Sequence, residues 1–168
     1  MELLIGCGHS RQKVIDPKRN GWTKLVTLDI NPATRPDVVY DLELGDLPFK
    51  DGAFDEIHAY EVLEHTGQQG DIVFFFHQFE EFHRVLKAGG LLVAKCPRWD
   101  KIWAWGDPGH KRVLSPASLV FLDQSEYKKQ VGDTDMRDYR RLYKADFRLE
   151  ALLSQWQDNW GFILKAIK

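Results

Sequence analysis

A glycine turn and a later aspartate are the first residues in this chain whose types and spacing could do chemistry. Gly6-Cys7-Gly8 follows an apolar run, Leu3-Leu4-Ile5, that is typical of a buried strand. A glycine turn after a strand lets the backbone come close to a bound molecule. Asp29 ends the next strand-like run, about 20 residues further on, which is the spacing at which a carboxylate reaches a ribose hydroxyl group. The pattern predicts a site for a nucleoside-containing cofactor, and Arg11 in place of a third glycine disfavours nicotinamide and flavin dinucleotides.

Two histidines could supply acid–base chemistry. His65 follows the strand-like run Phe54–Tyr60, and His110 lies after the run Leu91–Lys95. Imidazole changes its charge near neutral pH, so either ring could act on a substrate as a general base. The alternative is a structural or exposed ring, which is the commoner role of a lone histidine.

The segment 97–115, which contains His110, is the predicted substrate wall. It follows a strand at the edge where open α/β sheets bind ligands. Its tryptophans, Trp99, Trp103 and Trp105, could stack on a flat substrate or cover a sugar. Alternatively, they pack the loop onto the fold or fill a subunit contact.

Composition and charge narrow the class of protein. The chain has 168 residues, 43% hydrophobic and 29% charged, as expected for one globular domain over residues 1–168. The net charge of −2 does not favour nucleic-acid binding, no apolar run is long enough to span a bilayer, and the first residues lack the features of a signal peptide. Cys7 and Cys96 have no metal-ligand spacing and need not pair. We therefore expect no metal ion, and a cytoplasmic location is the simplest interpretation.

The alternation of strand-like and helical patterns predicts an α/β fold with a mostly parallel sheet. The best helix spans Ile72–Leu86, with an apolar stripe at helical spacing and Gly89-Gly90 as its expected end. The link 30–36 is short and contains two prolines, so we expect a helix-free loop there. A further helix should begin at Ser115-Pro116. The expected strands are residues 3–6, 25–29, 37–41, 54–60 and 91–95, followed by an antiparallel hairpin of residues 146–153 and 160–167 at the sheet edge.

Six short motifs occur in an order that one family shares. They are Leu3-Leu4-Ile5-Gly6-Cys7-Gly8, Leu28-Asp29, Asp41-Leu42 before Leu47-Pro48-Phe49, Phe54-Asp55-Glu56-Ile57, Glu61-Val62-Leu63-Glu64-His65 and Arg84-Val85-Leu86-Lys87-Ala88-Gly89-Gly90. Over residues 3–97 the chain resembles a class I S-adenosylmethionine (SAM)-dependent methyltransferase of the type 11 group. The resemblance implies SAM as the cofactor and a Rossmann-like, doubly wound, mostly parallel seven-stranded sheet with its last strand inserted antiparallel.

The resemblance also implies roles for individual residues at the cofactor. Asp29 would accept hydrogen bonds from the ribose hydroxyl groups, with Ile30 beside it, unless it is a solvated strand end. Asp41 would accept from the adenine amino group, with the Leu42 backbone nearby, unless it only starts a turn. The remaining implied contacts are the backbone of Gly6, Cys7 and Gly8 at the methionine and ribose part, and Glu61 and Val62 after the fourth strand. Glu61 could instead begin a short helix.

The methyl acceptor is not defined by the sequence. A small molecule, a glycan or lipid precursor, or a protein would fit, and a homo-oligomer is an open alternative. Leu4 and Ser10 stand where the family has an acid and a third glycine, and the chain starts directly at the first strand. These departures suggest a minimal form with an open cofactor cleft or one covered by another subunit. They also leave a non-catalytic binding module as the rival function, while aminopropyl transfer would need more acidic residues.

Overall fold

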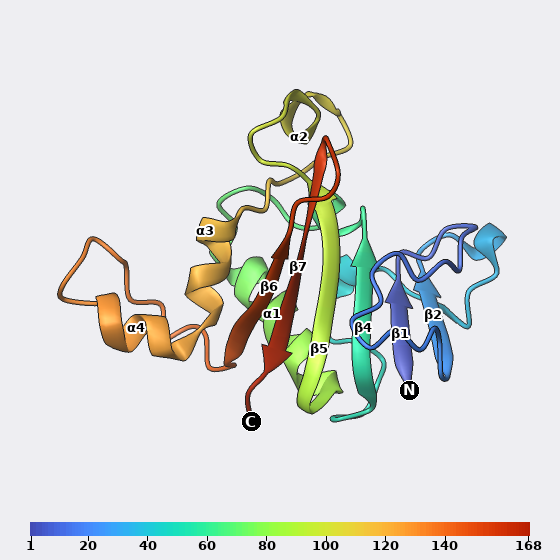
Figure 1. The fold of residues 1–168 in the computed structure, drawn as a ribbon, viewed down its shortest axis with the longest axis horizontal. Helices are drawn as coiled ribbons and strands as arrows, with labels where there is room; N and C mark the ends of the chain where they lie inside the picture. Colours follow the sequence, from blue (N-terminus) through green and yellow to red (C-terminus); the bar gives the residue numbers. More distant parts are fainter.

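The computed structural model describes residues 1–168 and contains one seven-stranded sheet with the strand order β3-β2-β1-β4-β5-β7-β6 (Figure 1). Only β7 runs antiparallel to its two neighbours, β5 and β6. This arrangement confirms the predicted Rossmann-like sheet with an antiparallel C-terminal hairpin. The strands are β1 (Glu2–Ile5), β2 (Leu25–Asp29), β3 (Val38–Val39), β4 (Phe54–Tyr60), β5 (Leu86–Pro97), β6 (Phe147–Leu153) and β7 (Asn159–Ala166).

The parallel strands β2, β1, β4 and β5 end at the same edge of the sheet. Leu3 and Ile5 of β1 are fully buried, as are Ile57 and Ala59 of β4. These alternate positions lie on one face of the sheet and belong to its hydrophobic core, whereas the other face of β4 carries the buried polar residues Glu56 and His58. The turns that follow these strands therefore lie close together, and this edge is where an open α/β sheet binds a ligand.

Helix α1 (Ile72–Val85) covers one face of the sheet with an aromatic stripe. Phe76, Phe79 and Phe82 are buried in a core of 27 hydrophobic residues. The Asp71 side chain caps the helix by accepting a hydrogen bond from the Phe74 N–H at 3.0 Å. The helix ends at Val85, so the prediction that Gly89-Gly90 would end it is wrong: those glycines lie within β5.

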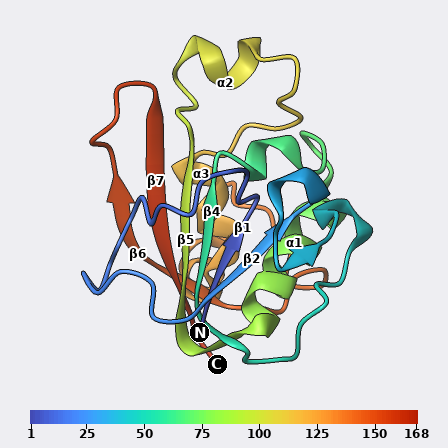
Figure 2. The same cartoon turned by 90° about the vertical axis from the view of Figure 1, so that its right-hand side faces the viewer.

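The opposite face of the sheet is covered without a helix. Residues 6–24 cross it as an irregular segment, visible in Figure 2 on the side away from α1. Ile15 is buried there, and its backbone N–H donates to the Tyr60 hydroxyl group at 3.2 Å. The ring edge of Trp22 packs against His58 of β4. This segment contains no helix.

The remaining helical segments are short. One 3₁₀ turn, η1 (Pro32–Thr34), lies in the link where no α-helix was expected, and no α-helix is present. Ser115 and Ser118 form the capping box at the start of α3, which confirms the predicted helix start. The others are η2 (Leu42–Leu44), η3 (Leu63–His65), α2 (Ile102–Gly106), α3 (Pro116–Leu119), η4 (Val120–Leu122) and α4 (Gln124–Gln130).

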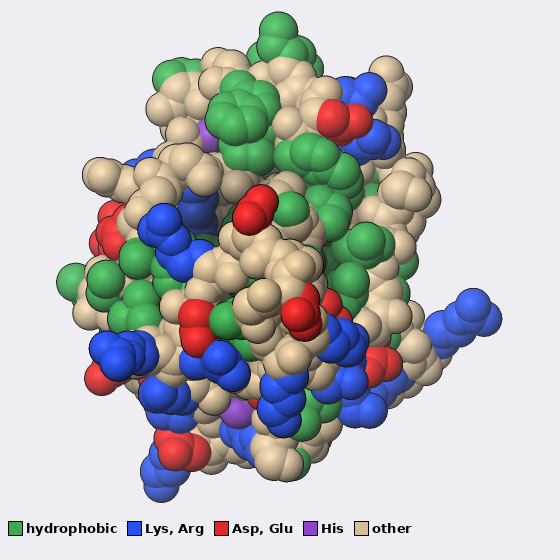
Figure 3. Space-filling view, turned by 90° about the vertical axis from the view of Figure 1, so that its left-hand side faces the viewer, with side chains coloured by type: hydrophobic (Ala, Val, Ile, Leu, Met, Phe, Trp, Pro, Cys, Tyr) green, Lys and Arg blue, Asp and Glu red, His purple; other side chains and the backbone are tan.

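Helix α2 projects beyond the carboxyl edge of the sheet and carries exposed apolar side chains. Ile102, Trp103 and Trp105 are all exposed, and hydrophobic side chains gather at that end of the molecule in Figure 3. Charged side chains of both signs cover the lower part of the same view. No helix has the length and apolar character needed to cross a lipid bilayer.

Candidate cofactor and acceptor site

The glycine turn after β1 is shaped by its contact with the turn after β4. Gly6 and Gly8 both have positive φ angles, 61° and 50°, which favour glycine. A Cβ atom at Gly6 would lie 2.5 Å from Cγ2 of Val62, whereas a Cβ atom at Gly8 would meet nothing within 4 Å. Gly6 is therefore required both by its backbone conformation and by the packing of Val62.

Asp29, at the end of β2, holds this turn in place. Its Oδ2 atom accepts a hydrogen bond from the Gly8 N–H at 2.7 Å, and its Oδ1 atom accepts from the Asn31 N–H at 2.8 Å. The residue is only 8% exposed. Each carboxylate oxygen has further acceptor capacity, which can face a ligand.

The first pocket lies between the turns after β1, β2, β3 and β4 and has a volume of about 360 Å³. This is within the range of small-molecule sites. Seven of the predicted cofactor residues line it, together with His65: Gly6, Asp29, Ile30, Asp41, Leu42, Glu61 and Val62. The lining residues that the sequence did not single out are Leu28, Tyr40, Glu43, Thr66 and Lys111.

Cys7 and Gly8 are not among the residues that line the first pocket. The Cys7 side chain is buried, and the Gly8 N–H is directed at Asp29. In this structure they support the glycine turn, and their contact with a cofactor stays a prediction. Asp41 starts a turn, because its Oδ1 atom accepts a hydrogen bond from the Glu43 N–H at 2.9 Å and caps η2. The residue also lines the first pocket, and its contact with adenine stays a prediction.

Glu61 follows β4 in a strained backbone conformation. Its φ angle is 52°, in the left-handed region that non-glycine residues rarely adopt. Its Oε1 atom accepts hydrogen bonds from Lys95 Nζ at 2.5 Å and from Asn159 Nδ2 at 2.7 Å. Such strain is typical of functional sites, where surrounding contacts hold a side chain in a required direction.

A second pocket, of about 370 Å³, adjoins the first and shares Glu61 and His65 with it. Its other lining residues are Glu64, Pro97, Trp103, Asp107, His110, Asp158 and Asn159. Of the segment 97–115, which was predicted to line the substrate site, Trp103 and His110 thus line the second pocket. Trp99 packs instead against Trp160, and Trp105 donates its indole N–H to the Trp99 carbonyl at 3.0 Å.

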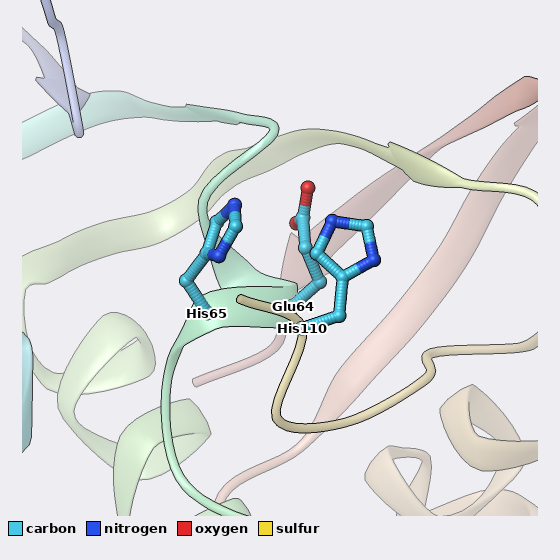
Figure 4. A group of neighbouring side chains, drawn as sticks. All are labelled: Glu64, His65 and His110. Atoms are coloured by element: carbon cyan, nitrogen blue, oxygen red, sulfur yellow. The ribbon is translucent and has the colours of Figure 1, made fainter. Parts of the chain in front are cut away.

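Glu64 is an unusual acid in this second pocket. It is only 2% exposed, and neither of its carboxyl oxygens has a hydrogen-bond partner. Burial, reinforced by the neighbouring Glu61 carboxylate, raises the pKa of Glu64 to about 8. In Figure 4 the imidazole rings of His65 and His110 flank its carboxyl group.

The two imidazole rings are oriented by backbone carbonyl groups. His65 Nδ1 lies 2.9 Å from the Gly109 carbonyl oxygen, and His110 Nδ1 lies 3.3 Å from that of Ala104. A carbonyl oxygen can only accept a hydrogen bond, so each Nδ1 carries a proton, and in the neutral form of the ring Nε2 then has a free lone pair. The ring centroids are 5.0 Å apart.

The loop that carries His110 is joined to η3 by its backbone and by a buried arginine. The N–H groups of Lys111 and Arg112 donate to the Glu64 carbonyl oxygen at 2.8 and 3.2 Å. The Arg112 guanidinium donates to the Leu63 carbonyl oxygen at 2.9 Å and also to Gln78 and Thr66. These contacts fix the two histidines relative to each other.

The fold and the two adjoining pockets define a Rossmann-like methyltransferase architecture, and a family comparison supports this conclusion. The family described as "Methyltransferase domain" matches residues 3–94, more than half of the chain. The chain belongs to this family, the type 11 group that its motifs indicate. No protein with a curated description matches the chain in sequence.

Solved structures of methyltransferases share the fold at low sequence identity. A SAM-dependent methyltransferase from Archaeoglobus fulgidus is 15% identical, with a TM-score of 0.56 over 98% of this chain and 85% of the other. The N-methyltransferase NodS from Bradyrhizobium japonicum WM9, in complex with S-adenosyl-L-homocysteine, is 16% identical, with a TM-score of 0.59 over 99% and 78%. A chain described as "the putative methyltransferase", in complex with the Haloferax volcanii Trm112 methyltransferase activator, is 15% identical, with a TM-score of 0.58 over 99% and 82%.

Proposed function

We propose that this protein binds SAM in the first pocket and transfers its methyl group to an acceptor held in the second pocket. The observation that carries the proposal is the position of Asp29. Its carboxylate lies at the end of β2, supports the glycine turn after β1 and lines the first pocket. A carboxylate at this place suits the two hydroxyl groups of a ribose, because each oxygen can accept a hydrogen bond.

The other walls of the first pocket fit the remaining parts of SAM. The Gly6 backbone lines this pocket, where it can contact the methionine part. Asp41, next to the Leu42 N–H, is proposed to accept from the adenine amino group. Ile30 is 63% exposed beside Asp29 and offers an apolar surface to the adenine ring. Contact with the flat ring would remove the apolar surface of this side chain from water, which contributes favourable free energy to binding.

The two pockets meet at Glu61 and His65, and this junction is where the methyl group would pass. Bound SAM supplies a methyl group already activated by its sulfonium centre. The chain has to hold the acceptor atom in line with that group and to exclude water. We propose that His65 and His110 act on the acceptor here, since their Nε2 lone pairs can accept a proton or bind a cation.

Calorimetric titration with SAM and with S-adenosylhomocysteine tests the cofactor assignment, and methyl-labelled SAM with panels of acceptors tests transfer. The panels should hold small molecules, glycan and lipid precursors, and proteins. We expect micromolar binding and label in one class of acceptor. Absence of binding at about 1 mM SAM would contradict the proposal, because a cofactor site should bind several kcal/mol more tightly than that. Binding with no transfer to any panel would instead favour a non-catalytic module.

A further inference from the structure

Three side chains that can bind a metal ion lie close together beside the junction of the two pockets. One carboxyl oxygen of Glu64 and one ring nitrogen each of His65 and His110 all lie within 4.8 Å of one another (Figure 4). Glu64 and His65 belong to η3, whereas His110 comes from the loop after α2. Two imidazoles and one carboxylate form a donor set that binds transition-metal cations.

The histidines are already oriented as metal-binding histidines are. Both rings direct Nδ1–H at a backbone carbonyl oxygen, of Gly109 for His65 and of Ala104 for His110. In the neutral rings this leaves Nε2 as the electron-pair donor; His110 Nε2 also lies 3.8 Å from the Asp107 Oδ2 atom, on the rim of the second pocket. Histidines that bind metal ions commonly have this arrangement, because the carbonyl group fixes the tautomer and the direction of the ring.

The Glu64 carboxyl group lacks any partner in the protein. A buried, unpaired polar group costs free energy, and native structures contain few of them. The two nearest cations are committed elsewhere. Lys95 pairs with Glu61, and the Arg112 guanidinium donates to Leu63, Thr66 and Gln78. A cation bound between Glu64 and the two imidazole rings would satisfy this group.

A second cluster in the same protein shows how a lysine can meet this need. Glu2, Glu56 and His58 also place three donor atoms within 4.8 Å of one another. There, however, Lys13 Nζ lies 3.2 Å from Glu2 and 2.9 Å from Glu56. The acids of that cluster are therefore paired with a lysine, while the acid of the Glu64 cluster is not.

We propose that Glu64, His65 and His110 bind one divalent transition-metal cation, such as Mn²⁺, Co²⁺ or Zn²⁺, and that this cation holds an oxygen atom of the methyl acceptor. Three protein ligands leave coordination positions open for an exogenous oxygen. All three residues line the second pocket, so the open positions face the proposed acceptor. The part concerning the acceptor rests on the proposed function, whereas the cation site does not.

The cation would make a hydroxyl acceptor more reactive. Coordination lowers the pKa of a bound hydroxyl group, which loses its proton to solvent water. A lone pair of that oxygen then forms the bond to the methyl carbon. The bond between carbon and sulfur breaks, and its electron pair goes to sulfur. The products are the methyl ether, S-adenosylhomocysteine and one proton, so atoms and charge balance.

Metal binding can be measured without any acceptor. Protein treated with a chelator is titrated with Co²⁺, Mn²⁺ and Zn²⁺ by calorimetry, and the Co²⁺ complex is followed by its visible absorption. We expect one ion per chain, with affinity reduced about tenfold or more in His110→Ala and Glu64→Gln. His77→Gln is the matched control, because His77 lies on the surface and outside both pockets. Circular dichroism and SAM titration establish that each variant is folded.

The outcomes separate this inference from the proposed function. SAM binding without metal binding would overturn the cation site and leave the methyltransferase proposal standing. Metal binding that persists unchanged in both ligand variants would also overturn it and would direct attention to the Glu2 cluster. Metal binding without SAM binding would support the cation site and contradict the proposed function. Retained SAM affinity in His110→Ala is expected, because His110 lies outside the first pocket.

Discussion

Asp29 accepts a hydrogen bond from the backbone N–H of Gly8 at 2.7 Å, so the end of β2 directly holds the turn that follows β1. One side chain thereby has two tasks. It fixes the backbone that must approach the cofactor, and it presents acceptor capacity to the first pocket. The sequence motif of two glycines and a later acid thus corresponds to one physical unit, a turn supported by a carboxylate.

Replacing Asp29 with alanine should weaken SAM binding by roughly 1–3 kcal/mol, because a charge-assisted contact to the ribose is lost. Calorimetric titration with SAM measures the change directly. Equal affinity in wild type and variant would contradict the ribose assignment.

Asp37 offers a matched control for this measurement. Its Oδ2 atom accepts from the backbone N–H and hydroxyl group of Thr27 at 2.8 and 2.7 Å, and it lies outside the first pocket. Asp37→Ala should lower the free energy of unfolding by about 1 kcal/mol and leave SAM affinity unchanged. A similar loss of SAM affinity in both variants would mean that the Asp29 effect is only structural.

The two glycines of the turn should respond differently to alanine. Gly8→Ala adds a side chain in open space and costs only the strain of a positive φ angle, on the order of 1 kcal/mol. Gly6→Ala adds the same strain and a clash with Val62, which costs roughly 1–3 kcal/mol more. Urea denaturation measures both values. Combining Gly6→Ala with Val62→Ala should recover part of the loss, and equal costs for the two single variants would contradict the packing argument.

The positions of the strands and the antiparallel C-terminal hairpin could be predicted from the sequence, because buried strands and turns have strong local signals. The end of α1 could not. Lys87 and Gly89-Gly90 are local signals for a helix end, yet Leu86 already pairs with Phe54 in the sheet. Pairing with a strand distant in sequence overrides the local preference and begins β5 earlier than the sequence indicates.

The site was predictable where it follows strand ends and hidden where it depends on a loop. Asp29 and Asp41 lie at or just after strands, so their places at the carboxyl edge follow from the order of elements. The proximity of Glu64 and His110 does not. It arises because the N–H groups of Lys111 and Arg112 bond to the Glu64 carbonyl oxygen. No spacing in the sequence reports such a contact.

The stability of the protein should fall as the pH decreases from 7 to 5 because of His58. This ring is fully buried beside Tyr60 and Trp22, and burial lowers its pKa despite the opposing effect of Glu56. A histidine with a lowered pKa in the folded state is protonated first in the unfolded chain. Stability is therefore fully present above the ordinary value near 6.5 and is lost as the pH falls below it, by up to about 1.4 kcal/mol per pH unit.

His58→Gln should flatten this slope between pH 7 and 5, as measured by denaturant titration at each pH. His83, whose pKa is also lowered by burial, accounts for part of the slope that remains. Protonation of Glu56 affects the stability only at lower pH. Burial opposes its ionisation, but hydrogen bonds from Lys13, Lys18 and His58 outweigh this and lower its pKa, so its contribution is lost only below about 4.5. An unchanged slope in His58→Gln would contradict the assignment.

Trp103 and Trp105 provide a matched pair that tests whether the loop after β5 selects the acceptor. Trp103 lines the second pocket, whereas the Trp105 indole group bonds to the Trp99 carbonyl oxygen and lies outside both pockets. Trp103→Ala should reduce turnover of an acceptor identified with labelled SAM by about tenfold or more, because positioning of the acceptor atom is lost. SAM affinity should stay within about threefold, since the first pocket is intact. Trp105→Ala should change neither quantity. Loss of SAM binding in Trp103→Ala, with turnover following cofactor occupancy, would mean that this tryptophan covers the cofactor and does not contact the acceptor.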